Sequence, residues 1–308
     1  MARAARLPAV FAAAKQDLAT VRDWLRFAVS RFTDAKLAFG HGTHEAYDEA
    51  AYLILHALHL PLDRLEPFLD AHLTAQERDT VAALLARRVT DRVPAAYLTR
   101  EAWLGEHRFY VDDRVIVPRS FIAELLRDAL EPWVPDAEAV GPALDLCTGS
   151  GCLAILAALA FPNARVEGAD ISAGALAVAR RNVADYGLAD RIELVKSNVF
   201  AQLAGRTYDL IVSNPPYVNA AAMRRLPEEY RHEPRLALAG GRDGLDVVRR
   251  IIAGAPAHLA SGGLLVVEIG HNREALEVAF PTLPFTWLET SSGDEHVFLL
   301  RREALVDA

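Results

Sequence analysis

The feature that most constrains this chain is an apolar run that ends in two consecutive prolines. The run, Tyr-Asp-Leu-Ile-Val at 208–212, is followed by Ser213 and then by Asn-Pro-Pro-Tyr at 214–217. Apolar and β-branched residues over this length predict a buried strand, and the prolines end it because they fix φ and lack an N–H donor. An isolated Asn-Pro pair is more often a simple turn. The full tetrapeptide is rarer, and it predicts a stiff polar loop at the carboxyl end of the strand, where open α/β sheets bind ligands.

The tetrapeptide at 214–217, here called the acceptor loop, is rich in oxygen acceptors. The side-chain oxygen of Asn214 and the backbone oxygens of Pro215 and Pro216 can accept hydrogen bonds. Tyr217 adds an aromatic face beside them. Such acceptors can hold both N–H bonds of an NH2 group on a planar system, and they stabilise the positive charge that develops as its nitrogen attacks. We therefore expect these four residues to be catalytic, in alkyl transfer to an amide or an exocyclic amine.

A second apolar run predicts a strand, a glycine turn and a helix in succession. The strand covers 143–147, the turn 148–151, and an apolar helical pattern follows at 152–161. Gly149 and Gly151 allow positive φ and a close approach of the backbone to a ligand, and the helix start supplies free N–H groups. The arrangement predicts a place where a cofactor meets the backbone.

Two further strands end in polar residues. The strand at 165–169 ends at Asp170, 19 residues after Gly151, and an acid at about that distance can bind both hydroxyls of a ribose. The strand at 192–196 leads to Asn198, which either contacts an adenine or lies in an ordinary polar turn. The glycine turn alone also fits a nicotinamide cofactor. Hydride transfer does not require an acceptor loop, however, so the glycine turn and the acceptor loop together favour methyl transfer to nitrogen.

The order of these motifs resembles that of the seven-stranded, S-adenosyl-L-methionine-dependent methyltransferases. More narrowly, the acceptor loop and the segment at 233–245 resemble the N(5)-glutamine methyltransferases that modify translation proteins. This resemblance, which runs from about Phe39 to the carboxyl terminus, implies an α/β fold. It implies a helical substrate-recognition domain at 1–100, a β-hairpin linker at 101–119 and a seven-stranded, Rossmann-like methyltransferase domain at 120–308.

Two substrates compete within that family: peptide chain release factors, and ribosomal protein L-three of the large subunit. Phe-Gly-His-Gly-Thr at 39–43 is similar to the ribosomal-protein type. After Pro118 and Arg119 the chain continues Ser-Phe-Ile-Ala-Glu, again close to that type, whereas the release-factor enzymes usually have Pro-Glu-Thr-Glu. The chain departs from the family pattern at Asn198, where Asp is commoner, and at Phe121, where Pro is expected. The resemblance favours L-three, with release factors as the alternative.

The motifs and the resemblance together predict the residues that bind S-adenosyl-L-methionine across the strand ends. They are Arg119, Asp145, Cys147, Thr148, Gly149, Ser150, Gly151, Asp170, Ile171, Asn198, Val199 and Asn214. The methionine part is expected at the glycine turn and the ribose on Asp170. Asp145 would order the turn or bind the cofactor amine, and Arg119 would bind the cofactor carboxylate or position the domains. No metal is expected, because a sulfonium is already a good leaving group.

Composition and charge limit the kinds of substrate and the alternative functions that fit this chain. The formal charge of −8 argues against a protein that mainly grips phosphate backbones, and it suits a basic protein substrate. A DNA adenine-amine methyltransferase shares the acceptor tetrapeptide, but no basic target-recognition region is visible. A non-enzymatic assembly factor that holds a ribosomal protein is a further alternative. The absence of a long uncharged apolar run or a secretory pattern predicts a cytoplasmic protein without a membrane span. Cys147 and Cys152 are expected to be small buried residues.

Other patterns predict the remaining elements. Thr74 to Glu77 forms a capping box for a helix that must stop near Val93, because Pro94 follows. Residues 103–111 alternate around a glycine and predict a hairpin. Ser120 is expected to cap a helix that runs through Leu130. A strand is expected at 264–269, a helix at 273–280 and a closing strand at 296–301.

The stretch from 218 to 245 is irregular and long for a simple connector. We interpret it as a lid that closes on the substrate peptide. Glu233 and Arg235 are then candidates for contact with that peptide, and an exposed surface position is the alternative for both.

Overall fold

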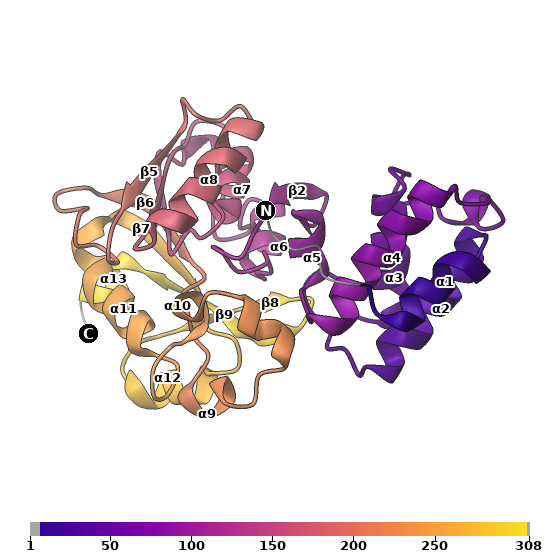
Figure 1. Cartoon of the computed structure of the whole chain (residues 1–308). Coiled ribbons are helices and arrows are strands. Elements are labelled where there is room, and N and C mark those ends of the chain that lie inside the picture. Colours follow the sequence, from indigo (N-terminus) through magenta and orange to yellow (C-terminus); the bar gives the residue numbers. More distant parts are fainter. Residues whose placement is uncertain (1–6, 307–308) are drawn as a thin grey trace. The chain divides into compact units, whose positions relative to one another are not determined.

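The computed structural model of the protein describes residues 7–306, which fall into two compact units (Figure 1). The helical unit takes the chain as far as Glu101 together with 227–232, and the sheet unit takes 102–226 and the chain from Glu233 onward. The expected division set 101–119 apart as a linker and assigned all of 120–308 to one domain, whereas here 102–119 belongs to the sheet unit and 227–232 to the helical unit. Residues 1–6 and 307–308, which that division also assigned, lie outside the described residues.

The helical unit is built from amphipathic helices around one core. Two of its helices begin with capping boxes, at Thr20 with Asp23 and, as predicted, at Thr74 with Glu77. Trp24 is among the side chains that fill the core. The elements are α1 (Ala9–Asp17), α2 (Val21–Asp34), α3 (Ala46–Ala57), η1 (Glu66–Phe68), α4 (Ala75–Thr90), α5 (Ala95–Thr99) and η3 (Glu228–His232).

The sheet unit contains the predicted hairpin and a seven-stranded sheet, which confirms the expected fold class. The hairpin is β1 (Glu101–Leu104) with β2 (His107–Tyr110). The large sheet consists of β3 (Pro142–Leu146), β4 (Arg165–Asp170), β5 (Ile192–Lys196), β6 (Tyr208–Ser213), β7 (Leu259–Glu268), β8 (Thr286–Thr290) and β9 (Gly293–Arg301). Its order is β5-β4-β3-β6-β7-β9-β8; the first five strands are parallel, and β9 is antiparallel to β7 and β8. Edge strand β8 was not predicted, because Leu288 is its one buried residue.

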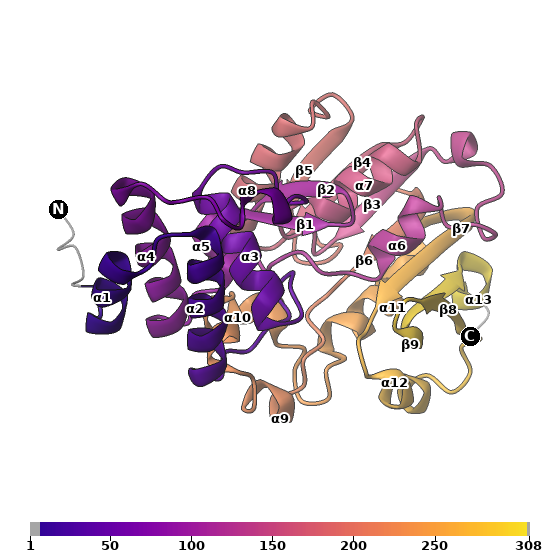
Figure 2. The same cartoon turned by 90° about the vertical axis from the view of Figure 1, so that its right-hand side faces the viewer.

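Helices cover both faces of this sheet. One core packs α6 and α7 against strand residues such as Leu210, and the other packs α11 and α12 against the alternate residues, such as Ile211 (Figure 2). The helices are α6 (Ile122–Arg127), η2 (Ala137–Ala139), α7 (Cys152–Ala160), α8 (Ala173–Asp185), α9 (Ala220–Met223), α10 (Arg235–Leu238), α11 (Asp246–His258), α12 (Arg273–Ala279) and α13 (Arg302–Val306). None of the helices between residues 7 and 306 has both the length and the apolar character that crossing a membrane requires.

The helix expected from Ser120 through Leu130 is shorter than predicted. It runs only over Ile122–Arg127, because Ala129 and Leu130 take positive φ and turn the chain. Ser120 does accept the backbone N–H of Ile122, at 3.2 Å, but its hydroxyl is donated to Glu268 on β7. The Ser120 hydroxyl thus makes a hydrogen bond to a distant strand of the unit as well as the local one at the start of the helix.

The order of the strands creates a switch point between β3 and β6. The chain proceeds from β3 to β4 on one side, and from β6 to β7 on the other. Leu146 and Ser213 are paired at the carboxyl ends of β3 and β6. Cys147 and Asn214 therefore follow neighbouring strand ends at one edge of the sheet, which is the edge where such folds bind ligands.

Candidate functional site

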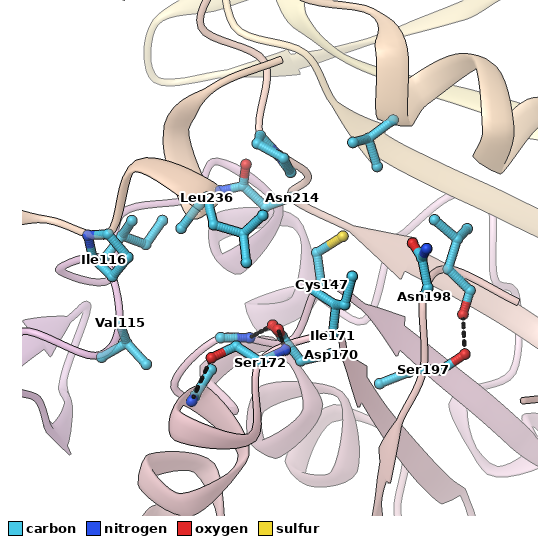
Figure 3. A pocket seen from close by; sticks show the side chains of 18 of the residues that line it. Val115, Ile116, Cys147, Asp170, Ile171, Ser172, Ser197, Asn198, Asn214 and Leu236 are labelled. Atoms are coloured by element: carbon cyan, nitrogen blue, oxygen red, sulfur yellow. Dashed lines mark hydrogen bonds between the residues drawn. The ribbon is translucent and has the colours of Figure 1, made fainter. Parts of the chain in front are cut away.

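A cavity of about 290 Å³ lies at this edge of the sheet unit. Figure 3 shows Val115 and Ile116 toward one end, Asn198 toward the other, and Asn214, Leu236, Cys147 and Asp170 between them. Of the predicted site residues, those that line the cavity are Cys147, Gly149, Asp170, Ile171, Asn198, Val199, Asn214 and Pro216. The predicted residues that do not line it are Arg119, Asp145, Thr148, Ser150, Gly151, Pro215 and Tyr217.

The glycine turn after β3 has the backbone conformation that its sequence predicts. Gly149 has φ +55° and Gly151 has φ +81°, and a Cβ on Gly151 would lie 3.1 Å from Cβ of Ala179. Asp145, beneath the turn, accepts the Thr148 hydroxyl at 2.6 Å and the backbone N–H of Ala154 at 3.0 Å. Burial raises the pKa of Asp145 to about 7, against the effect of these donors. Asp145 therefore orders the turn from below.

Asp170 presents a carboxylate to the cavity from the end of β4. Its Oδ2 accepts the backbone N–H of Gly149 at 2.9 Å, and its Oδ1 accepts that of Ser172 at 2.8 Å. Burial raises the pKa of Asp170, and these two N–H donors oppose the shift. A carboxylate has about four acceptor positions, so capacity for further donors remains on both oxygens.

The loop after β5 brings Asn198 and Val199 to the cavity. Val199 has φ +55°, and its carbonyl accepts the Ser197 hydroxyl at 2.5 Å. Asn198 Oδ1 accepts Nη2 of Arg250 at 2.9 Å. The amide oxygen of Asn198 keeps a second lone pair and its amide nitrogen remains a donor, so the two hydrogen bonds to an adenine stay a prediction.

The acceptor loop begins with an amide whose orientation is determined by its partner. Nδ2 of Asn214 donates to the carbonyl of Arg119 at 3.2 Å. Because a carbonyl can pair only with the nitrogen end of a side-chain amide, Oδ1 of Asn214 is the end left to accept. Pro215 is buried, and the Tyr217 hydroxyl donates to Glu268 at 3.0 Å. The loop is held at both ends by side-chain hydrogen bonds.

Arg119 is held by Glu233, away from the cavity lining. Its Nη1 and Nη2 donate to the two Glu233 oxygens at 2.6 and 2.7 Å, and Glu233 also accepts the backbone N–H of Val117. Glu233 is only 4% exposed, so the suggestion that it contacts a substrate peptide is wrong. Its carboxylate is used to clamp the chain around Arg119. Arg235, the other residue suggested for peptide contact, is exposed.

Sequence reasoning missed two polar side chains that organise the site. Asn182 on α8 donates to the backbone oxygens of Ser150 and Tyr110, and its Oδ1 accepts the N–H of Tyr110. Glu268 accepts hydrogen bonds from three groups around the acceptor loop. A signal for Glu268 was present, because an acid directly after the apolar run 264–267 is the same pattern that drew attention to Asp170.

Three glycines pack directly against the acceptor loop, at positions where a side chain would not fit. A Cβ on Gly240 would lie 2.7 Å from the carbonyl oxygen of Pro216 and from Cα of Tyr217. A Cβ on Gly244 would lie 2.4 Å from the backbone carbonyl oxygen of Tyr217, and one on Gly270 would lie 2.7 Å from the Tyr217 ring. The backbone of the acceptor loop and the ring of its tyrosine thus lie against bare backbone.

The cysteines and the metal-ligating side chains add no chemistry of their own. Burial raises the pKa of both the Cys147 and the Cys152 thiol to about 12, so neither is a thiolate at neutral pH. Cys147 is half-buried and lines the cavity, whereas Cys152 is buried as expected. Within residues 7–306, no three His, Cys, Asp or Glu side chains are grouped as a metal site requires.

Comparison with known proteins places the chain among methyltransferases. The family described as Methyltransferase small domain matches residues 124–229. A solved structure of ribosomal protein L11 methylase from Lactobacillus delbrueckii subsp. bulgaricus is 22% identical, covers 58% of this chain and 77% of its own, and has a TM-score of 0.41. That value is too low to carry an argument.

Much closer relatives are curated as ribosomal protein uL3 glutamine methyltransferases. The protein of Bordetella pertussis is 60% identical over 94% of this chain and 98% of its own length. That of Burkholderia pseudomallei is 61% identical over 93% and 95%, and that of Neisseria meningitidis serogroup B is 60% identical over 96% and 98%. At this identity and coverage, the chain belongs to the ribosomal protein uL3 glutamine methyltransferase family.

Proposed function

We propose that this protein transfers a methyl group from S-adenosyl-L-methionine to the side-chain amide nitrogen of a glutamine in ribosomal protein uL3, the L-three protein of the large subunit. The observation that carries the proposal is the acceptor loop: Asn214 lines the cavity with Asp170 and keeps its side-chain oxygen for a substrate donor. The names of relatives that match nearly the whole chain support uL3 as the substrate.

The residues around the cavity fit S-adenosyl-L-methionine, which is the methyl donor. Asp170 has acceptor capacity for two ribose hydroxyls, and Gly149 brings backbone to the cavity without a side chain. Ile171, Val199 and Val247 give the cavity apolar walls suited to a purine ring. When bound, the donor supplies an electrophilic methyl carbon whose bond to sulfur breaks as the new bond to nitrogen forms.

The chain itself has the task of holding a weakly nucleophilic nitrogen. Oδ1 of Asn214, which lines the cavity, accepts one N–H of the glutamine carboxamide. The sequence also suggested that the Pro215 carbonyl accepts the other N–H and that Tyr217 packs on the carboxamide plane, but neither residue lines the cavity, and we do not assign them these contacts. The Asn214 oxygen faces the nitrogen as it becomes positively charged, and it stabilises that charge without having to reorganise. The extra proton leaves to water after the bond has formed, so a strong general base is not required.

Methylation assays with purified substrates test the proposal. The protein is incubated with methyl-labelled S-adenosyl-L-methionine and, separately, with uL3, with a release factor and with duplex DNA containing adenine. We expect label only in uL3, and mass spectrometry should locate a single methyl group on a glutamine side chain. Label in the release factor alone would move the protein to the other substrate class. Label in DNA alone would mean that the methyl acceptor is an adenine amine and not a glutamine carboxamide.

The cellular setting forms part of the same proposal. A substrate that is assembled into ribosomes is met in the cytoplasm, and the net charge of −8 suits a basic ribosomal protein rather than direct binding to nucleic acid. Comparison of uL3 from cells with and without the gene, by mass spectrometry, should reveal the loss of one methyl group. An unchanged uL3 mass would contradict the assignment in the cell.

A further inference from the structure

Glu268 lies at the carboxyl end of β7, next to the strand end from which the acceptor loop leaves. β6 and β7 are parallel neighbours in which Ser213 is paired with Val267. The Glu268 side chain is only 1% exposed and is not part of the cavity lining, so cofactor contact does not account for it. A buried carboxylate is costly unless it is well hydrogen-bonded, and its partners therefore indicate its role.

Three donors surround this carboxylate. Oε1 accepts the Tyr217 hydroxyl at 3.0 Å, while Oε2 accepts the Ser120 hydroxyl at 2.6 Å and the backbone N–H of Phe121 at 2.9 Å. The Ser120 oxygen itself accepts the N–H of Ile122, so its own hydrogen is directed to Glu268. The arrangement suits an acceptor-only carboxylate that holds two separate pieces of chain together.

Both of these pieces belong to the acceptor loop or control it. Tyr217 is the last residue of the loop. Ser120 directly follows Arg119, whose carbonyl accepts Nδ2 of Asn214 and so decides which end of that amide is left for the substrate. Glu233 clamps Arg119 from the other side. The carboxylate of Glu268 is therefore hydrogen-bonded to the tyrosine of the loop. It is also hydrogen-bonded to Ser120, the residue that directly follows the carbonyl that orients Asn214.

We propose that Glu268 is a positioning residue for the methyl transfer, which holds Tyr217 and the carbonyl that orients Asn214 in the arrangement that accepts a carboxamide nitrogen. The inference rests on the proposed function. Because Glu268 acts through other residues and lines no part of the cavity, its loss should lower kcat and leave the binding of S-adenosyl-L-methionine unchanged.

The test compares Glu268→Gln with Tyr217→Phe and with the double variant. In Glu268→Gln, the amide oxygen can still accept from Ser120 and Phe121, and the new NH2 group meets the Tyr217 oxygen, so the fold is kept while the tyrosine loses its acceptor. The matched control is Tyr208→Phe. Tyr208 is 1% exposed, as Glu268 is, and donates its hydroxyl to Glu167 at 2.9 Å from the start of β6, at the opposite end of the strand from the acceptor loop.

We expect Glu268→Gln to lower kcat with uL3 by roughly 10- to 100-fold, since misplacement of reacting groups by small distances has effects of this size. The affinity for S-adenosyl-L-methionine, measured by calorimetry, should stay within about twofold. The double variant should be no slower than the slower single variant, because both act through one hydrogen bond. Tyr208→Phe should lower stability alone and leave kcat near that of the wild type.

A wild-type kcat in folded Glu268→Gln would overturn the inference, as would effects that multiply in the double variant or a loss of cofactor affinity. If Glu268→Gln does not fold, Tyr217→Phe and Ser120→Ala replace it, and their effects on kcat must combine non-additively for the inference to hold. A wild-type protein that methylates none of the three substrates would overturn the proposed function itself, which distinguishes that failure from the failure of the Glu268 inference.

Discussion

At the scale of single residues, Asn214 and Asp170 line one cavity but are assigned different tasks. Asn214→Ala removes the acceptor for the target nitrogen, and we expect the contact of Asn214 with the cofactor to contribute little, so methylation should be lost while calorimetry finds near-normal affinity for S-adenosyl-L-methionine. Asp170→Ala should do the reverse first, weakening cofactor affinity by about 10- to 100-fold, as expected for hydrogen bonds to a charged group. A variant Asn214→Ala that keeps its turnover but loses cofactor affinity would contradict this division.

Asp145 links the glycine turn to pH. Its pKa in the folded protein is raised from 3.8 to about 7, so between these values the folded state keeps a proton that the unfolded chain has lost. The contribution of Asp145 to stability should therefore fall as pH rises through this window and change no further above it. Asp145→Asn does not titrate, and its free energy of unfolding should improve relative to wild type between about pH 4.5 and about pH 8. Urea unfolding at both pH values measures the difference, and a constant difference would refute the raised pKa.

At the scale of elements, the segment at 238–246 packs directly on the chain that leaves β6. Val218 donates its N–H to the Leu238 oxygen at 2.9 Å, and Gly240 donates to the Val218 oxygen at the same distance. The later part of the lid expected at 218–245 is thus joined by backbone hydrogen bonds to Val218, the residue that directly follows the acceptor loop. Closure of the earlier part on a substrate peptide stays a prediction.

Gly240 is a position where this packing leaves no room for a side chain. In Gly240→Ala the new Cβ would meet three backbone atoms at 2.7 Å, among them the Pro216 oxygen, and backbone cannot turn aside as a side chain can. We expect a loss of roughly 1–3 kcal/mol in unfolding free energy together with lower kcat. Gly174→Ala on α8 is the control, since its Cβ would find only ordinary contacts of 3.5 Å or more. Equal stability of the two variants would show that the close approach is unimportant.

At the scale of the whole molecule, the chain enters the helical unit twice. The second segment of this unit, 227–232, lies in sequence between two segments of the sheet unit, and buried charged residues hold it in place. Glu229 accepts the N–H of Ala38 and Nη1 of Arg92, each at 3.0 Å, and lies 3.5 Å from Nη1 of the fully buried Arg88. Arg88 also pairs with Glu49 at 2.6 Å. The segment at 227–232 is thus part of the helical unit, although the rest of that unit ends at Glu101.

Removal of this charge should be costly. Glu229→Gln leaves buried arginine charge less well paired, and we expect the unfolding free energy to fall by roughly 2–4 kcal/mol. Glu228→Gln is the matched control, because the neighbouring Glu228 side chain is 59% exposed and its ion pair with Arg92 should contribute at most about 1 kcal/mol. Urea unfolding followed by circular dichroism compares them. Similar losses in both variants would mean that burial of Glu229 adds nothing.

The chain's class and the order of its site were accessible from the sequence because they depend on local rules. Apolar runs predicted the parallel strands, glycines predicted the turn after β3, and prolines predicted the end of β6. These elements lie where expected, except that β7 begins at Leu259, before the strand predicted from Leu264. The relatives confirm the methyltransferase assignment. The β8 strand and the early end of α6 were missed, because β8 buries only Leu288 and because the positive φ of Ala129 and Leu130 that turns the chain after α6 has no sequence signal of its own.

Sequence by itself therefore determined the strands, the glycine turn and the acceptor loop, since each is set by the steric and hydrogen-bonding properties of a few adjacent residues. Only the tertiary structure decided that Glu268 holds Tyr217 and Ser120, and that Arg119 is paired with Glu233. These contacts join positions 51, 148 and 114 residues apart. Such distances are closed by the order of strands in the sheet, and that order is decided by how whole elements bury their apolar faces against one another.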